Sequence, residues 1–207
     1  MFNRIFPSAT FPADTLLYAD GFGPSDRYKY TAFTYTATAA STKRHNGQGI
    51  TYNATTTKVD CGSQIVGTGS ITLLCWVNAT SAGEGNVGRI VDNGKFWVRT
   101  SNTNPPITVT SDGATEVSSA NNSLPTGTEK FVAVTRTAAG AVNIYINGVL
   151  SGSADQASGT PANGSTNLII GNNNAAGATW DGTIHNVRIF NKILTVSQIG
   201  QIYNLEV

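Results

Sequence analysis

Aromatic and amide side chains are the residues of this chain whose chemistry suits a ligand most directly, because together they can recognise sugars. An aromatic ring packs against the C–H groups of a saccharide, while amides and carboxylates bond its hydroxyls. The candidates for such a saccharide site are Trp97 with Arg99, Tyr145, Trp180 with Asp181, and the loop amides Asn172, Asn173 and Asn174.

Each candidate also has a plainer interpretation. Trp97 and Tyr145 could cover the second face of a sheet, and the run GNNNAAGA could be a solvated turn. Trp180 is different, since packing explains poorly a large aromatic beside a loop of glycine, asparagine and alanine. We therefore expect the loop around Trp180 to be the strongest of the candidates.

Catalytic residues are harder to find. Glycoside hydrolysis needs two carboxylates about 5 to 10 Å apart. The glutamates are isolated from other acids, at Glu84, Glu116, Glu129 and Glu206. A Ser-His-Asp triad would have to use His45, in a polar loop, or His185, which alternation places with Val187 and Ile189. We expect no enzyme, with a divergent glycoside-active enzyme as the remote alternative.

The two thiols and two imidazoles do not form a metal motif, since they fall short of any zinc-site spacing. If the strands ending at Cys61 and beginning before Cys75 form a hairpin, the residue opposite Cys61 lies near Ile71. That register separates the two cysteines, so we expect two buried free thiols.

Charge and hydropathy exclude two classes of partner. Of the 207 residues only 12% are charged, and the formal net charge is +1. The basic residues are scattered, with Lys43 and Arg44 the densest pair, so we expect no nucleic-acid binding. No apolar run approaches the roughly 20 residues that cross a bilayer, and the first 22 residues lack the pattern of a signal peptide. We expect no membrane insertion and no cleaved signal.

Short β-rich runs alternate with turn signals from about Gly47 onward, which predicts an all-β fold. Four dipeptides that accept positive φ separate them, at Asn93-Gly94, Asp112-Gly113, Asn147-Gly148 and Asp181-Gly182. The clearest strands are expected at residues 71–78, 95–100, 107–110, 130–135, 142–147, 168–171 and 183–190.

Alternation within the strands indicates two packed sheets. Phe96 and Val98 share one face while Trp97 and Arg99 share the other, and FVAVT is apolar on both faces, as in a central strand. One helix is expected at the C-terminal end, with Thr195 and Gln198 as a capping box. Its apolar residues, Ile199, Ile202 and Tyr203, should pack against the sandwich edge.

The first residues differ from the rest, being rich in aromatics separated by proline, glycine and aspartate. We predict an extended arm over residues 1–23 and a single domain over residues 24–207. An arm of this kind can join neighbouring copies by strand addition. With the low-charge surface it favours a virion component, such as a bacteriophage head decoration, head fibre or tail adhesin, on the virion surface or extracellular after release.

Residues 47–203 resemble a known family. The stretch GQGITYNATTTKVDCG, then GSITLLCWVNA, EKFVAVTRTAAGAVNIYINGVL, TNLIIGNNN and WDGTIHNVRIFNKILTVSQIGQIY, follow one another as in laminin-G-like domains of the concanavalin A-like superfamily. The resemblance implies a two-sheet antiparallel jelly-roll sandwich with a short C-terminal helix, and a lectin-like binding or adhesion function. Cell-surface glycans and neighbouring assembly proteins are the expected partners.

Three departures from the family limit what carries over. His185 stands where members commonly have a calcium-binding Asp, and a neutral imidazole is a poor ligand for calcium. Glu129, Lys130 and Phe131 replace a common Trp-His-His strand start. The Glu-x-Asp-x-x-Glu strand motif of the family's glycoside hydrolases is absent. We therefore expect no metal or cofactor and carry over no catalytic acids.

Overall fold

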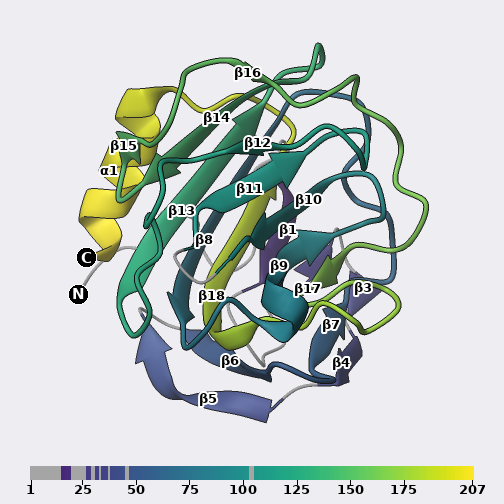
Figure 1. Ribbon diagram of the computed structural model, residues 1–207, viewed down its shortest axis with the longest axis vertical. Helices are drawn as coiled ribbons and strands as arrows, with labels where there is room; N and C mark the ends of the chain where they lie inside the picture. Colours follow the sequence, from purple (N-terminus) through teal and green to yellow (C-terminus); the bar gives the residue numbers. More distant parts are fainter. Residues whose placement is uncertain are drawn as a thin grey trace.

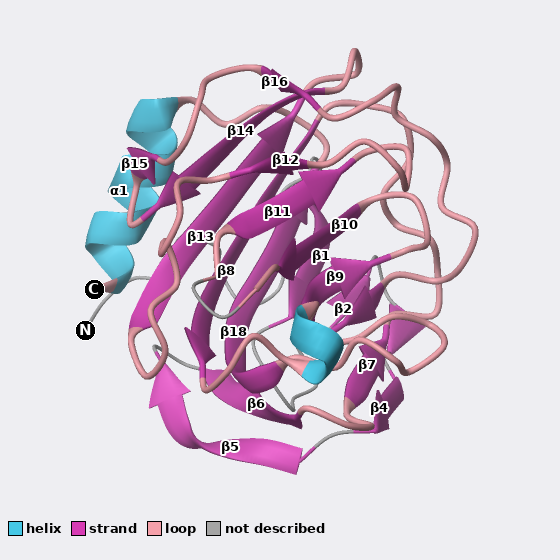
Figure 2. Ribbon diagram, viewed as in Figure 1, coloured by secondary structure: helices cyan, strands magenta, loops and turns pink. Residues whose placement is uncertain are grey.

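Runs of β-branched and aromatic residues between tight turns pair into two antiparallel sheets. The computed structural model describes residues 15–19, 27–28, 31–32, 34–36, 38–44, 47–102 and 105–207, with side chains from residue 49 onward. All strand pairs within this part of the chain are antiparallel, and the sheets stack as a sandwich with one long helix beside it (Figures 1 and 2). The predicted jelly-roll class is confirmed.

The large sheet runs in the order β15-β14-β13-β8-β18-β1-β2-β3. Its members are β15 (Val149–Leu150), β14 (Ala141–Ile146), β13 (Glu129–Arg136), β8 (Ile71–Ala79), β18 (Asp181–Phe190), β1 (Thr15–Ala19), β2 (Arg27–Tyr28) and β3 (Thr31–Ala32). Three further strands attach to this path, namely β16 (Gln156–Ala157) on β14, β6 (Gly47–Asn53) on β18 and β5 (Thr38–Arg44) on β6.

The small sheet runs in the order β12-β11-β10-β9-β17-β7-β4. Its members are β12 (Val117–Ser118), β11 (Ile107–Thr110), β10 (Trp97–Thr100), β9 (Arg89–Asp92), β17 (Ile169–Ile170), β7 (Lys58–Asp60) and β4 (Thr34–Thr36). A short 3-10 helix, η1 (Glu84–Asn86), precedes β9.

Alternating side chains from both sheets fill the interior, as the period-two pattern predicts. Val132 and Val134 of the central strand β13 point inward, while Phe131 and Ala133 point outward. Phe96 and Val98 belong to the same interior cluster, and Trp97 does not. Each of the seven strands expected from sequence is confirmed; β10 and β17 are shorter than expected, while β8, β13 and β18 are longer.

Three of the four turn predictions are confirmed, and one is wrong. Asn93-Gly94, Asp112-Gly113 and Asn147-Gly148 each join consecutive strands with glycine at positive φ. Asp181-Gly182 instead opens β18. Gly182 is needed there for space, since a Cβ would come within 2.0 Å of the carbonyl oxygen of Asn78 on the neighbouring strand.

The C-terminal helix α1 (Val196–Glu206) has the predicted capping box. The Thr195 hydroxyl accepts a hydrogen bond from the Gln198 backbone N–H at 3.2 Å, and the Gln198 side chain accepts one from the Thr195 backbone N–H at 2.9 Å. The expected docking place is wrong, because Ile199, Ile202 and Tyr203 pack on the outer face of the large sheet rather than on the sandwich edge. Figure 1 shows α1 running beside β13, β14 and β15.

His185 lies on a different face from the one predicted. The register between β18 and β8 shifts between His185 and Arg188, and Asn186 adopts positive φ, so β18 carries a bulge there. A bulge inserts one residue and reverses the alternation. His185 therefore does not share the inner face of Val187 and Ile189.

Both cysteines are buried and lie outside any disulfide, as predicted. The hairpin from which this was argued does not exist, because β7 belongs to the small sheet and β8 to the large sheet. Cys61 and Cys75 instead both point into the interior.

The predicted N-terminal arm is partly a strand of the domain itself. Residues 15–19 form β1, which pairs with β18 through registers that include Thr15 with Phe190 and Ala19 with Val187. The rest of residues 1–23 lies outside the described part of the chain. The strand nevertheless ties this segment into the large sheet.

Candidate functional site

The outer face of the small sheet carries two of the predicted sugar-binding residues, Trp97 and Arg99, beside further charged side chains. The β9–β10 hairpin pairs Trp97 with Asp92 and Arg99 with Arg89, so these four side chains stand on the face opposite the interior cluster. Polar residues continue the same face on β11, where Thr108 pairs with Arg99. Two predicted residues, Trp97 and Arg99, are thus brought together.

Arg89, Trp97 and Arg99 form what we call the Arg-Trp-Arg cluster. The guanidinium carbon of Arg89 lies 4.0 Å from the centroid of the Trp97 ring, and that of Arg99 lies 5.0 Å away. Both distances are within the range of a cation–π contact. Trp97 is only 6% exposed, so it is the floor of the cluster rather than an open stacking platform.

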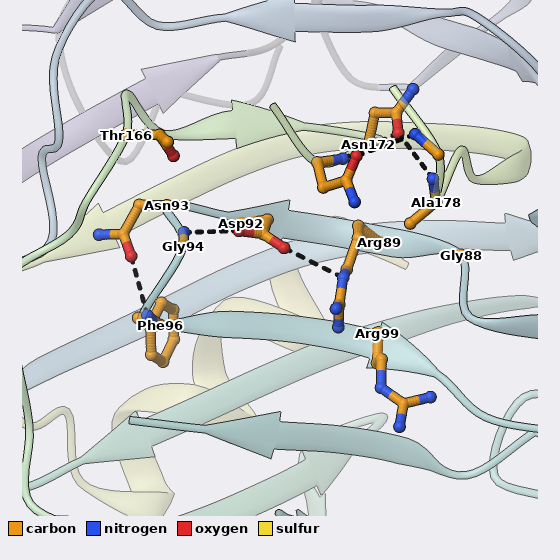
Figure 3. Close-up of polar contacts among 12 residues, drawn as sticks. Gly88, Arg89, Asp92, Asn93, Gly94, Phe96, Arg99, Thr166, Asn172 and Ala178 are labelled. Carbon is orange, nitrogen blue, oxygen red and sulfur yellow. Dashed lines mark hydrogen bonds and ion pairs between the residues drawn. The ribbon is translucent and has the colours of Figure 1, made fainter. Parts of the chain in front are cut away.

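Each arginine of the cluster has an acidic neighbour. Arg99 Nη2 donates to both carboxylate oxygens of Glu116 at 2.8 Å, and its Nη1 donates to the Thr100 carbonyl at 3.0 Å. Arg89 Nε lies 3.0 Å from Asp92 Oδ2, an ion pair that Figure 3 marks. Asp92 Oδ1 accepts a short hydrogen bond, 2.6 Å, from the Gly94 backbone N–H.

Burial sets the electrostatics of the Arg89–Asp92 pair. Loss of solvent lowers the pKa of Arg89 and raises the pKa of Asp92, because it disfavours the charged form of each group. Their mutual attraction opposes both shifts, and the Gly94 N–H also favours the Asp92 carboxylate. The pair is therefore ionic but poorly solvated.

The asparagine loop lies against the backbone of Arg89, whose N–H donates to the Ala178 carbonyl at 2.9 Å. Asn172 is buried and folds the loop, because its side-chain oxygen accepts from the N–H groups of Asn173 and Ala178 at 2.8 and 3.1 Å (Figure 3). Asn173 in turn accepts from the Gly177 N–H at 2.9 Å. Of the three asparagines only Asn174 is exposed, and its carbonyl accepts from Lys58 Nζ at 3.2 Å.

Trp180 does not present a ring to a ligand. The residue is 0% exposed and belongs to the interior cluster. Its backbone N–H donates to the Gly171 carbonyl at 2.8 Å, which turns the side chain inward beside β17. The prediction for Trp180 was wrong because the neighbouring loop, which its composition suggested to be flexible, is a turn closed by hydrogen bonds of Asn172 and Asn173. Asp181, half-buried at the start of β18, pairs in register with Asn53.

Tyr145 is also removed from the cluster. It lies on the outer face of the large sheet, where α1 covers it together with Trp76 and Phe131. The plainer interpretation, that Tyr145 covers a sheet face, is the one the structure bears out. Burial raises the pKa of its hydroxyl.

Arg89 is the residue that the sequence argument missed. The run from Arg89 to Asp92 was not among the expected strands. The four-residue loop 93–96 pairs Trp97 with Asp92, and a register shift after Val98 then places Arg89, rather than Ile90, opposite Arg99. A two-residue Asn93-Gly94 turn would have paired other residues. The sequence signal that could have indicated this pairing is the presence of Arg89 and Arg99 on either side of the Asn93-Gly94 turn.

His185, in the place of the family's calcium-binding Asp, is buried on the outer face of the large sheet. Its Nε2 lies 3.2 Å from Thr183 Oγ1 and 3.7 Å from Glu129 Oε1. Gly49 packs against the imidazole, since a Cβ there would come within 2.1 Å of the ring. Within the described ranges, no three His, Cys, Asp or Glu side chains gather as a metal site.

The family model of the concanavalin A-like lectin/glucanases superfamily matches residues 52–200. The chain belongs to this superfamily. Among curated proteins, none matches this superfamily member. The family assignment and the sandwich agree with the resemblance found in the sequence.

Solved structures similar to this superfamily member come from several kinds of protein. Domain 4 of AbnA, a GH43 extracellular arabinanase from Geobacillus stearothermophilus, in complex with arabinotriose, has TM-score 0.61 and 18% identity, covering 86% of this chain and 90% of that one. The receptor binding domain of botulinum neurotoxin C/D mosaic serotype has TM-score 0.65 and 15% identity, covering 92% and 51%. Trypanosoma rangeli sialidase, in complex with 2,3-difluorosialic acid, has TM-score 0.68 and 14% identity, covering 93% and 33%.

These similarities establish the fold and leave the activity open. The chain spans about half of the toxin domain and a third of the sialidase. The fold therefore occurs both in proteins named as glycoside-acting enzymes and in a receptor binding domain. In the parts of the chain that are described, no helix has the length and apolarity to cross a membrane.

Proposed function

We propose that the chain is a non-enzymatic carbohydrate-binding module whose ligand lies on the outer face of the small sheet. The Arg-Trp-Arg cluster is the observation that carries this proposal, because it sets two guanidinium groups with hydrogen-bonding capacity side by side on a rigid sheet. Membership of a lectin/glucanase superfamily and the arabinotriose complex of the similar AbnA domain support it.

The engagement of the two acids beside the cluster supports binding over catalysis. A glycosidase needs one carboxylic acid that donates a proton and a second carboxylate that acts as base or nucleophile. Asp92 accepts a hydrogen bond from the Gly94 N–H with one carboxylate oxygen and forms an ion pair with Arg89 through the other. Both carboxylate oxygens of Glu116 accept hydrogen bonds from Arg99. A release of reducing sugar that disappears in Asp92→Asn would instead establish the enzyme.

The direct test is a glycan array followed by calorimetric titration of the best ligand. We expect Arg99→Gln to weaken binding at least tenfold, because the variant removes a guanidinium of the cluster. Tyr145→Phe and Asp181→Asn are the matched controls at the other predicted positions, and both should bind as the unaltered chain does. Binding that survives Arg99→Gln but falls in Asp181→Asn would place the ligand at the β18 start instead.

A second candidate, an assembly component displayed on a virion surface, is favoured by exposed apolar residues at one end of the large sheet. Val149 and Leu150 of the edge strand β15 and Val196 of α1 are exposed, with Val149 at 69%. The β14–β15 turn packs on α1, because a Cβ on Gly148 would lie 3.3 Å from the Gly200 Cα. Exposed apolar groups beside a sheet edge suit contact with another copy.

Light scattering during size exclusion tests this second candidate. We expect the unaltered chain to form a discrete oligomer and Val149→Lys to shift it to monomer, with Lys192→Glu as an exposed control. If the unaltered chain and both variants are monomers, the proposed assembly role is excluded, together with the proposed partner proteins of a virion.

A further inference from the structure

The cluster offers guanidinium groups to a ligand, and hardly any aromatic surface. Trp97 is 6% exposed, with the guanidinium carbons of Arg89 and Arg99 at 4.0 and 5.0 Å from its ring centroid. A sugar that stacks on an aromatic face needs that face open, and neutral sugars depend on such stacking. The chemistry that remains is that of two largely buried guanidinium groups, whose planar donor forks match a carboxylate.

The two arginines differ in how far their donors are used. Both terminal nitrogens of Arg99 already donate hydrogen bonds, Nη2 to the two oxygens of Glu116 and Nη1 to the Thr100 carbonyl. Arg89 Nη1 is buried and has no hydrogen-bond acceptor among the described residues. Its Nε contacts Asp92 Oδ2 at 3.0 Å without the geometry of a hydrogen bond. Arg89 therefore holds an unused donor beside Trp97, which a ligand reaches only when a neighbouring side chain moves aside.

Glu116 occupies Arg99 in the way that a ligand carboxylate would. Both carboxylate oxygens of Glu116 accept from the one nitrogen Nη2, and the Glu116 side chain is 40% exposed while that of Arg99 is 12% exposed. An ion pair with one partner this exposed is weak and exchanges readily. Displacement of Glu116 frees the Nη2 donors of Arg99, whose guanidinium lies over the same Trp97 ring as that of Arg89.

We infer that the Arg-Trp-Arg cluster recognises the carboxylate of an acidic saccharide, with Arg89 as the specificity-determining residue and Glu116 as an internal competitor. This inference rests on the proposed carbohydrate-binding function and names the class of sugar. The ligand carboxylate takes the donors of Arg89 and replaces Glu116 on Arg99.

The experiment compares acidic oligosaccharides with their own neutral forms. Oligomers of uronic acids and of sialic acids are titrated into the full chain, each beside its carboxyl-reduced counterpart, at low and at physiological salt. We expect binding of at least one acidic form, at least tenfold weaker binding of its reduced form, and weakening by salt.

Two matched substitutions have opposite expected effects. Arg89→Gln should weaken binding of the acidic form at least tenfold and leave little preference over the reduced form. Glu116→Gln removes the competitor and should strengthen binding several-fold, which loss of a merely structural ion pair would not do. Thermal unfolding of both variants checks that each is folded.

The possible results separate the inference from the proposed function. Equal binding of acidic and reduced forms, or binding of neutral glycans alone, would overturn the inference and leave carbohydrate binding standing. Weaker binding in Glu116→Gln would also overturn it. If no saccharide of either kind binds, both the inference and the proposed function fall.

Discussion

Burial controls the reactivity of the two thiols, Cys61 and Cys75. Both are 0% exposed, and burial raises the pKa of Cys75 to about 12, so its thiol stays protonated at neutral pH. We predict that neither thiol reacts with an aromatic disulfide reagent at pH 8 in the folded chain, and that two react per chain in guanidinium chloride. Fewer than two in the unfolded chain would show that the cysteines are oxidised.

Asp112 stabilises the turn after β11 through its ionised form. Its carboxylate accepts hydrogen bonds from the N–H groups of Ala114 and Thr115 at 2.8 and 2.7 Å, and these bonds hold its pKa below the ordinary value. Because the folded-state pKa is the lower one, the stabilisation is complete above about pH 4 and is lost as the pH falls below that.

We predict that Asp112→Asn, which keeps an acceptor but cannot ionise, is less stable at pH 6 by about 1 kcal/mol. The difference should shrink steadily as the pH falls below about 4, since the Asp112 carboxyl then binds a proton in the unfolded chain while it stays ionised in the folded one. Urea unfolding at several pH values measures it, with the exposed Asp155→Asn as control. A difference that grows on acidification would contradict the assigned direction.

Single residues also show what sequence could and could not give. The alternation of KFWVRT placed Trp97 and Arg99 on the outer face correctly, because strand geometry alone fixes that. Trp180 was misplaced, since the neighbouring loop looks flexible by composition while Asn172 bonds it closed. The position of Arg89 could not be predicted, because it depends on the length of the β9–β10 loop and on a register shift between Val98 and Arg99, and residue type specifies neither.

At the scale of elements, α1 is fixed to the large sheet by a buried ion pair near its end. Arg188 Nη1 lies 2.5 Å from Glu206 Oε1, and Trp76 Nε1 donates to Glu206 Oε2 at 2.7 Å. Removing one member leaves the other charge buried and unpaired, which costs about 3 kcal/mol or more. The pair therefore anchors a helix whose cap lies at the opposite end.

We predict that Glu206→Ala lowers the free energy of unfolding by about 3 kcal/mol in urea titrations. Leu205→Ala is the matched control on the same turn, since Leu205 is 53% exposed and should change stability by no more than about 0.5 kcal/mol. Equal losses in the two variants would mean that the end of α1 frays and that Arg188 is hydrated in solution.

Secondary-structure elements were predicted well where hydrogen bonds between nearby residues specify them. They were predicted poorly where pairing with distant strands specifies them. The Thr195 capping box fixed the start of α1, because both its bonds are local. The face of His185 depended on the bulge at Asn186, where β18 exchanges β6 for β1 as its neighbour on one side. That exchange is set by distant strands, and the alternation within β18 carries no sign of it.

At the scale of the whole molecule, the N-terminal segment closes part of the large sheet. β1 pairs with the second half of β18, from Val187 to Phe190, on the side opposite β8. Deleting it exposes backbone groups of a long strand and opens an edge that can pair with another chain. A chain that begins at Asp26 would therefore lose a strand of its own sheet as well as the residues predicted as an arm.

Two truncations separate these contributions. We predict that a chain beginning at Thr15 unfolds at the same temperature as the full chain to within about 2 °C. A chain beginning at Asp26 should lose about 3 kcal/mol, which lowers the Tm by about 6 to 12 °C for a domain of this size, and should self-associate through the opened edge. Calorimetry and light scattering measure both. Equal stability of the two truncations would show that β1 adds nothing to the sheet. Because the chain beginning at Thr15 keeps every described strand, a change of its oligomeric state relative to the full chain assigns assembly to residues 1–14.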